Sequence, residues 1–123
     1  MGSPVDYKAM FRLIDDAEKH LAANPGGGKN PEALQGFKSF AAQMLVASCH
    51  NGTVDQKAAS MEEWASMLYR SRAPKGYTFE HLRTLIGGEL YSMRIALQIL
   101  QGAQRRRSTA PATRPSTRKE PRK

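Results

Sequence analysis

The sequence predicts an all-α protein, a small bundle of four helices followed by a basic C-terminal tail. Three observations carry this prediction. Four segments place apolar residues at steps of three and four, the spacing of one helix face, and no segment sustains the alternation of a half-buried strand. The length of 123 residues, 40% of them apolar, suits one domain. We therefore assign residues 1–103 to a helical domain and residues 104–123 to a disordered basic tail.

The composition indicates the cellular compartment in which we expect the protein. The single cysteine, Cys49, cannot form an internal disulfide, and this fits a reducing compartment. No apolar run approaches the roughly 18 to 20 residues that a bilayer span needs, and residues 1–6 lack the basic start and apolar core of a signal peptide. We expect a soluble, cytoplasmic protein that contacts no membrane and holds no cofactor.

The first helix is predicted to begin with Ser3 as its N-cap, Pro4 at its first position and Asp6 in its first turn. A carboxylate in that turn meets the positive end of the helix dipole. The segment 24–29, with one proline and three glycines, ends the helix and forms a flexible link. The apolar face consists of Met10, Leu13, Ile14, Ala17 and Leu21.

The second helix repeats this start with Asn30 as cap and Pro31 at the first position, and we expect it to end at Gly52. Its buried face is predicted from residues spaced by three and four. These are Leu34, Phe37, Ala41, Met44, Leu45 and Ser48.

The third helix is predicted to follow the capping pair Thr53 and Gln56 and to run to about Ser71. Its inward face consists of Val54, Ala58, Met61, Ala65 and Leu68, with Trp64 beside it. A second capping pair, Ser60 and Glu63, allows a break near Ala59 and hence a fifth helix. We favour the continuous helix.

The fourth helix is predicted over 79–101, after a turn at 72–76 and with Thr78 as its cap. Gly87 and Gly88 each cost about 1 kcal/mol inside a helix, so they predict a kink or a close helix crossing. Apolar residues on two faces predict burial among several helices or a homodimer through this helix. One face carries Leu82, Ile86, Met93, Leu97 and Leu100, and the other carries Leu85, Ile95 and Ile99.

The net charge of +8 is concentrated in the tail. Residues 104–123 carry eight Arg and Lys against one Glu, a net charge of +7, whereas 1–103 carry eleven against ten, a net charge of +1. The tail has no Leu, Ile, Val, Met or aromatic residue, so it cannot bury enough apolar area to offset the entropy of ordering. Its cations are Arg105, Arg106, Arg107, Arg114, Arg118, Lys119, Arg122 and Lys123.

The sequence contains few cysteine and histidine residues that could serve in catalysis or metal binding. Cys49 and His50 are neighbours, and on a helix they would lie about 100° apart instead of forming a thiol–imidazole pair. We expect Cys49 to be a small buried apolar residue and His50 to lie at the negative end of a helix. The three histidines show no H-x-x-x-H spacing, and a single cysteine excludes C-x-x-C. We predict that the protein is not an enzyme and binds no metal.

The Gly-rich stretch 26–28 followed by Lys29 invites comparison with a phosphate-binding loop. The pattern G-x-x-x-x-G-K would need glycine at Ala23 and Ser or Thr at Asn30, so the match fails. We interpret the stretch as a linker.

The segment 61–88 has the outline of a helix-turn-helix, in which the start of the second helix enters the major groove of DNA. The turn is longer than the standard unit, and a plain antiparallel hairpin has the same sequence outline. Under the first interpretation, base and phosphate contacts would come from Tyr77, Thr78, Glu80, His81 and Arg83, with backbone phosphates held by Arg70, Arg72 and Lys75.

These patterns favour a nucleic-acid-binding accessory protein whose tail contacts phosphates without sequence preference, most simply those of DNA. The alternative is a protein-interaction module that docks a partner on apolar helix faces, with the tail contacting an acidic protein surface.

Overall fold

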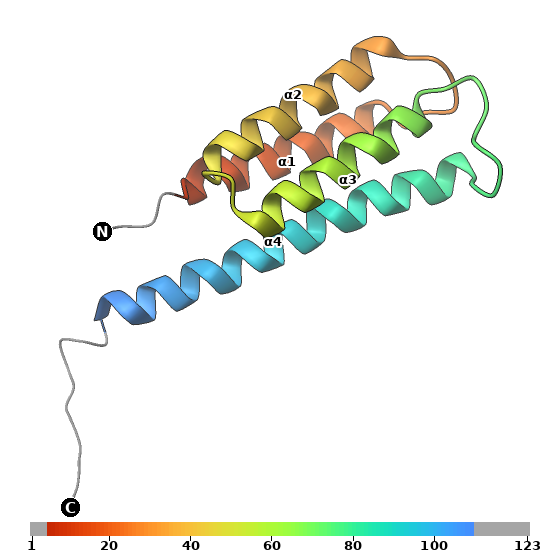
Figure 1. Cartoon of the computed structure of the whole chain (residues 1–123). Coiled ribbons are helices and arrows are strands. Elements are labelled where there is room, and N and C mark those ends of the chain that lie inside the picture. The colour runs from red at the N-terminus through yellow and green to blue at the C-terminus, as the bar shows by residue number, and fades with distance from the viewer. Residues whose placement is uncertain (1–4, 110–123) are drawn as a thin grey trace, which may run out of the picture.

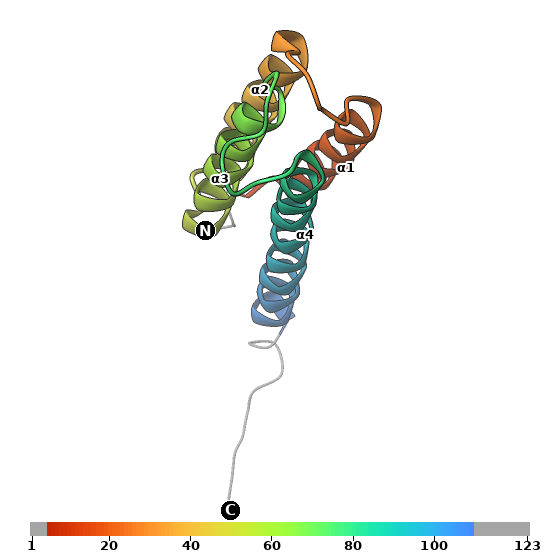
Figure 2. The same cartoon turned by 90° about the vertical axis from the view of Figure 1, so that its right-hand side faces the viewer.

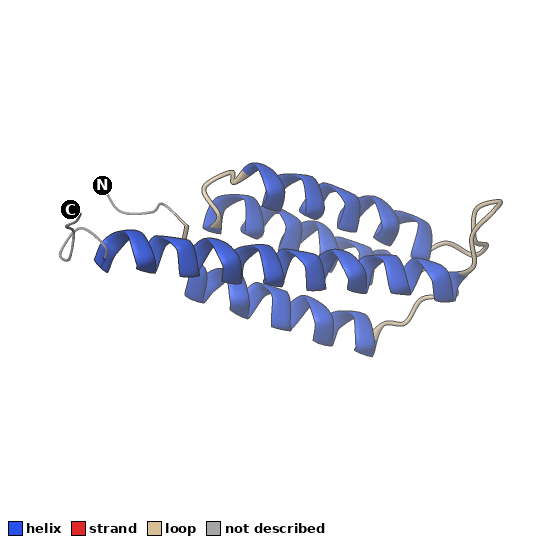
Figure 3. Cartoon of the chain, turned by 90° about the horizontal axis from the view of Figure 1, so that it is seen from below, coloured by secondary structure: helices blue, strands red, loops and turns tan. Residues whose placement is uncertain are grey.

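The computed structural model describes residues 5–109, and the only regular structure in this range is four α-helices (Figure 1; Figure 3). They are α1 (Tyr7–Ala23), α2 (Pro31–Ala47), α3 (Gly52–Leu68) and α4 (Phe79–Thr109). The prediction of an all-α bundle of four helices is confirmed.

Each helix runs antiparallel to the one before it, and α4 returns beside α1 to close the bundle (Figure 1). Figure 2 shows α2 and α3 on one side of the bundle and α1 and α4 on the other. The short connections favour this up-and-down order. The first connection (24–30) and the third (69–78) therefore lie at one end, which we call the loop end. The second connection (48–51) lies at the opposite end.

The core lies along the axis of the bundle and combines flexible methionines with small alanines around Phe37. Methionine fills irregular space, and alanine lets neighbouring helices approach closely. All five residues predicted for the inward face of α3 are buried. The buried apolar residues are Met10, Ile14, Ala17, Ala33, Phe37, Ala41, Met44, Val54, Ala58, Met61, Ala65, Leu68, Tyr69, Leu82, Ile86, Leu90, Met93 and Leu97.

The start of α1 differs from the prediction. Asp6 is the N-cap, accepting a hydrogen bond from the Ala9 amide at 3.0 Å, and is not part of the first turn. The Asp6 amide donates to the Ala47 carbonyl at the end of α2, 2.8 Å away, and this tertiary bond sets where the helix begins. Ser3 and Pro4, predicted as cap and first residue, lie outside the described residues.

The boundary between α2 and α3 also differs. Helix α2 starts as predicted, with the Asn30 side chain accepting from the Ala33 amide. It ends at Ala47, before a turn in which Cys49 and His50 take left-handed φ values of 52° and 58°. Gly52 is the first residue of α3.

The cap of α3 is Asn51, whose side chain accepts hydrogen bonds from the amides of Thr53 and Val54. The predicted cap, Thr53, is therefore wrong, because an asparagine two residues earlier reaches the same free amides. Helix α3 is continuous through Ala59, as favoured, and ends at Leu68, short of the predicted Ser71.

Hydrogen bonds and close packing hold the first connection against the third connection and the start of α4. Tyr69 follows α3, and its hydroxyl donates to the Asn24 carbonyl at 2.7 Å. Arg83 on α4 donates to the Pro25 carbonyl at 2.8 Å. Gly26 has a φ of +89° and lies so close to Leu68 that an added Cβ would overlap that side chain, so glycine is needed there. These contacts join segments that are distant in the chain.

Helix α4 is longer than predicted and runs to Thr109, so residues 104–109 of the predicted disordered tail are helical. Tyr7 Oη donates to Gln104 Oε1 at 2.6 Å and anchors this part of α4 beside α1. Arginines near the C-terminus of a helix also stabilise the helix, because they interact with the negative end of its dipole. Gly87 and Gly88 do not mark a close crossing, because a Cβ at either would meet nothing within 4 Å.

The helical glycines provide a test of packing. A Cβ at Gly36 would lie 2.5 Å from His20 Nε2, which hydrogen-bonds the Ala33 carbonyl, and the ring is held between Phe37 and Phe40. We expect Gly36→Ala to destabilise the protein by at least about 1 kcal/mol. Gly88→Ala, made in open space, should stabilise it by up to about 1 kcal/mol. Urea unfolding of both variants measures this, and effects of the same sign would contradict it.

Alkaline unfolding tests the contact between the two connections. Burial raises the pKa of Tyr69 from 10.0 to about 12. The unfolded chain loses this proton near pH 10 and the folded chain near pH 12, so stability is full below pH 10 and falls above it, by at most about 1.4 kcal/mol per pH unit.

We expect Tyr69→Phe to cost about 1–2 kcal/mol at pH 8, since the Asn24 carbonyl loses its donor, and to lack the alkaline decline from this group. The stability difference from the parent chain should shrink between pH 9 and pH 11. Tyr91→Phe, at a residue 62% exposed, is the control. Curves for the Tyr69 and Tyr91 variants that stay parallel over this range would refute the assignment.

Candidate nucleic-acid interface

The cations of the predicted tail begin on the last turns of α4. Arg105 and Arg106 are exposed and helical, and the backbone of Arg107 continues the same helix. Because Gln104 is bonded to the first residue of α1, these arginines lie just beyond the body of the bundle, at the end opposite the loop end (Figure 1). The other predicted cations, Arg114, Arg118, Lys119, Arg122 and Lys123, lie outside the described residues.

The predicted helix-turn-helix segment is an antiparallel hairpin. Helix α3 lies side by side with the first part of α4 (Figure 1), whereas the two helices of a helix-turn-helix cross at about 90–120°. The connection of ten residues, 69–78, gives the chain enough length to reverse direction. The geometry matches the plain hairpin that the sequence also allowed.

The residues predicted to read bases take part in the fold. The Tyr77 ring lies between Trp64, with centroids 5.9 Å apart, and His81, at 6.0 Å. Thr78 Oγ1 accepts from the His81 amide as the helix cap, and Arg83 holds the Pro25 carbonyl. Glu80 and His81 are exposed in the first turn of α4. Tyr77, Thr78 and Arg83 are thus accounted for by structural roles.

The loop end gathers the predicted phosphate-contacting cations and adds one. Lys29 of the first connection lines the same pocket as Arg70 and Arg72 of the third, and Lys75 lies exposed in the third connection. Neither connection contains Asp or Glu. From the sequence alone, Lys29 is predicted only to be part of a linker. The signal that could have found it is the bundle topology, because the first and third connections of an up-and-down bundle share one end.

Two cations in the middle of the bundle, Arg94 and Lys57, are paired instead. Arg94 on α4 donates to Asp15 at 2.8 Å and to Glu18 at 2.7 Å, both on α1. The hydrogen bond to Asp15 is the main cause that raises the pKa of Arg94 above its ordinary value. Lys57 Nζ on α3 lies 3.8 Å from Glu89 Oε1 on α4. These pairs link neighbouring helices and neutralise these two cations.

The cysteine and histidines are dispersed. Cys49 is exposed, so its prediction as a buried residue is wrong, because the left-handed turn after α2 turns it outward. His50 lies beyond α2 and faces Asp55 with 3.3 Å between Nδ1 and Oδ2. His20 packs at the other end of α1 and α2. Within residues 5–109 no three His, Cys, Asp or Glu side chains gather into a metal-binding group.

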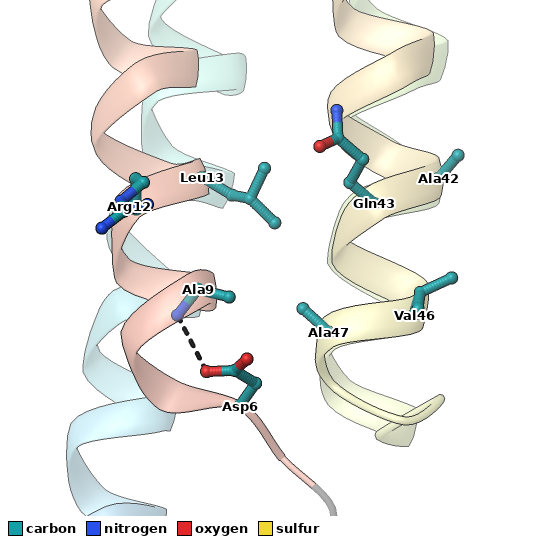
Figure 4. A pocket seen from close by; sticks show the side chains of 8 residues that line it. All are labelled: Asp6, Ala9, Arg12, Leu13, Ala42, Gln43, Val46 and Ala47. Carbon is teal, nitrogen blue, oxygen red and sulfur yellow. Dashed lines mark hydrogen bonds between the residues drawn. The ribbon is translucent and has the colours of Figure 1, made fainter.

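A groove of about 590 Å³ lies between α1 and α2 (Figure 4). Leu13 points into the space between the two helices and Arg12 points away from it, while Gln43 of α2 lies level with Leu13 and Ala47 lies level with Ala9. Val46 on the rim is 76% exposed. The groove is mostly apolar and holds no cluster of cations, so its chemistry differs from that of both basic ends.

Two further findings bear on the class of protein. Among residues 5–109, no helix combines the length and apolarity that a bilayer crossing needs. Comparison of the chain with protein-family models, with curated proteins and with solved structures found no match. Any assignment of function therefore has to come from the residues and their placement.

The hairpin geometry predicts that His81 contributes little to the binding of duplex DNA. If α3 and α4 do not read DNA as a helix-turn-helix, His81→Ala should change the affinity for duplex DNA by less than about twofold, because the exposed ring has no base to contact. Titration with two duplexes of different sequence at pH 7.5 measures this. A loss of about tenfold or more on one duplex only, equivalent to about 1.4 kcal/mol, would restore base reading by this helix.

Proposed function

We infer that the protein is a nucleic-acid-binding accessory protein whose basic tail provides salt-sensitive contact with backbone phosphates. The observation that supports this is the segregation of charge, with a net charge of +7 on residues 104–123 and +1 on residues 1–103. A polyanion is drawn mainly to the tail, since the body as a whole has almost no excess charge. Duplex DNA, with about one negative charge per 1.7 Å of its axis, is the ligand that this charge density fits best.

The chemistry of the tail favours phosphate over base contact. Six of its eight cations are arginine, whose planar guanidinium binds phosphate oxygens through two parallel hydrogen bonds. The tail contains no Tyr, Phe or Trp on which a base could stack. Binding through it is therefore expected to be insensitive to sequence and to serve packaging or regulation.

The bundle would orient the ligand relative to the tail. Arg105 and Arg106 begin the basic segment on a helix that is packed against the body, so the first contacts come from a defined position. The loop end offers a second basic region in Arg70, Arg72 and Lys75, which would hold backbone phosphates.

The second candidate is a protein-interaction module. The observations that favour it are the apolar groove between α1 and α2, with Val46 at its rim, and the outer face of α4, where Tyr91 is 62% and Ile99 65% exposed. A partner helix in the groove or a homodimer through α4 would cover these residues. In this case the tail would contact an acidic protein surface, and duplex binding would be negligible at physiological salt.

Charge-matched variants test the leading proposal. Replacing Arg114, Arg118 and Lys119 by Gln removes three tail cations, and replacing Lys8, Lys19 and Lys38 by Gln removes three exposed cations of α1 and α2. We expect the tail variant to reduce the slope of log K against log salt by up to about 2.7, because each phosphate contact contributes about 0.9. The body variant should leave the slope nearly unchanged.

Equilibrium titration of a 20-base-pair duplex between 50 and 200 mM salt gives these slopes, and circular dichroism verifies that helix content is retained. Equal affinities and slopes for the two variants would exclude the tail as the phosphate-binding element. Negligible binding by the parent chain at both salt concentrations would favour the interaction module.

A further inference from the structure

A pocket of about 560 Å³ opens at the loop end, where α2 begins and α3 has just ended. Its walls come from both connections, with Lys29 on one side and Arg70 and Arg72 on the other. The pocket exists because Tyr69 and Arg83 bond the first connection and so hold the two segments together. The chain positions that meet here are some forty residues apart.

The charge of this pocket is of one sign. No carboxylate lines it, and within residues 5–109 none of Lys29, Arg70 and Arg72 forms an ion pair. Arg70 Nε donates to the Ser66 carbonyl at 3.0 Å, which holds the guanidinium on the rim and leaves its terminal nitrogens without a described partner. Helix α2 begins at the same place, and Glu32 in its first turn, which does not line the pocket, offsets the positive end of its dipole. The three cations of the lining therefore carry the preference for an anion.

Part of the pocket lining is apolar, and we call this part the floor. It consists of Pro31 and Leu34, on the first turns of α2, and Tyr69, whose ring is stacked on Phe37 and whose hydroxyl donates to the Asn24 carbonyl. A bare phosphate would leave this floor uncovered. A flat ring attached to a phosphate would use both surfaces, because nucleobases pack on apolar side chains and on arginine planes while their phosphates take charged donors.

We propose that this pocket binds one nucleotide of a nucleic-acid strand, with Lys29, Arg70 and Arg72 contacting its phosphate and Pro31 and Leu34 its base. The proposal rests on the function inferred above and adds a defined second contact to it. The tail attracts the strand without preference, whereas the pocket takes an unpaired or terminal nucleotide, since a base inside a duplex is not available for packing on the floor.

The test uses the full chain and a single strand of ten thymidines carrying a 5′-phosphate. We expect the amide resonances of residues 29, 30, 32–34 and 69–72 to shift during a ¹⁵N NMR titration, Pro31 having no amide proton. The double variant R70Q/R72Q should lose these shifts and bind the strand at least fivefold more weakly. The control K8Q/K19Q removes the same charge from α1, where both lysines are exposed, and should bind like the parent chain. R70K/R72K should recover part of the loss, because it keeps the charge.

The outcomes separate this proposal from the previous one. If the strand binds and the tail variant weakens it, but the pocket amides do not shift and R70Q/R72Q equals K8Q/K19Q, the pocket proposal is overturned while the tail proposal stands. If the pocket amides shift and the tail variant has no effect, the tail proposal is overturned while the pocket proposal stands. Shifts with thymidine monophosphate and none with the strand would overturn the assignment to a strand and leave a free-nucleotide site.

Discussion

The hydrogen bond from the Tyr69 hydroxyl to the Asn24 carbonyl joins the two connections of the loop end. Burial of the Tyr69 ring against Phe37 fixes the direction of this bond, and the close approach of Gly26 to Leu68 lets the backbones come near enough to form it. Together with the hydrogen bond from Arg83 to the Pro25 carbonyl, it brings Lys29 beside the arginines of the third connection. The shape of the loop end therefore depends on this buried tyrosine.

The distribution of charge becomes clear only in three dimensions. The body has a net charge of +1, but its two loop-end connections carry four cations and no carboxylate, which leaves three excess negative charges on the rest of the body. In the middle of the bundle, Arg94 lies against Asp15 and Glu18, and Lys57 against Glu89. The molecule therefore has a middle of net negative charge and a basic region at each end.

Helix α4 sets the distance between these regions. It begins at the loop end and carries Arg105 at the other, and with a rise of about 1.5 Å per residue these points lie roughly 39 Å apart. This is close to one helical turn of duplex DNA, about 34–36 Å. The length of α4 is thus compatible with both ends meeting the same polyanion.

The all-α class, the four helices and most of the core follow from the spacing of apolar residues, because helical spacing selects the buried face before any partner helix is known. The excess of cations after residue 103 also follows from the sequence, as a matter of counting.

The helix ends and the second basic region depend on contacts between segments that are distant in the chain. The Asp6 amide bonds Ala47 and the Tyr7 hydroxyl bonds Gln104, and neither partner is local. Likewise, Lys29 lies beside Arg70 and Arg72 because an up-and-down bundle returns the chain to the same end. The spacing of apolar residues along the chain indicates the helix face on which each residue lies. Contacts between distant segments depend in addition on how these faces pack against one another.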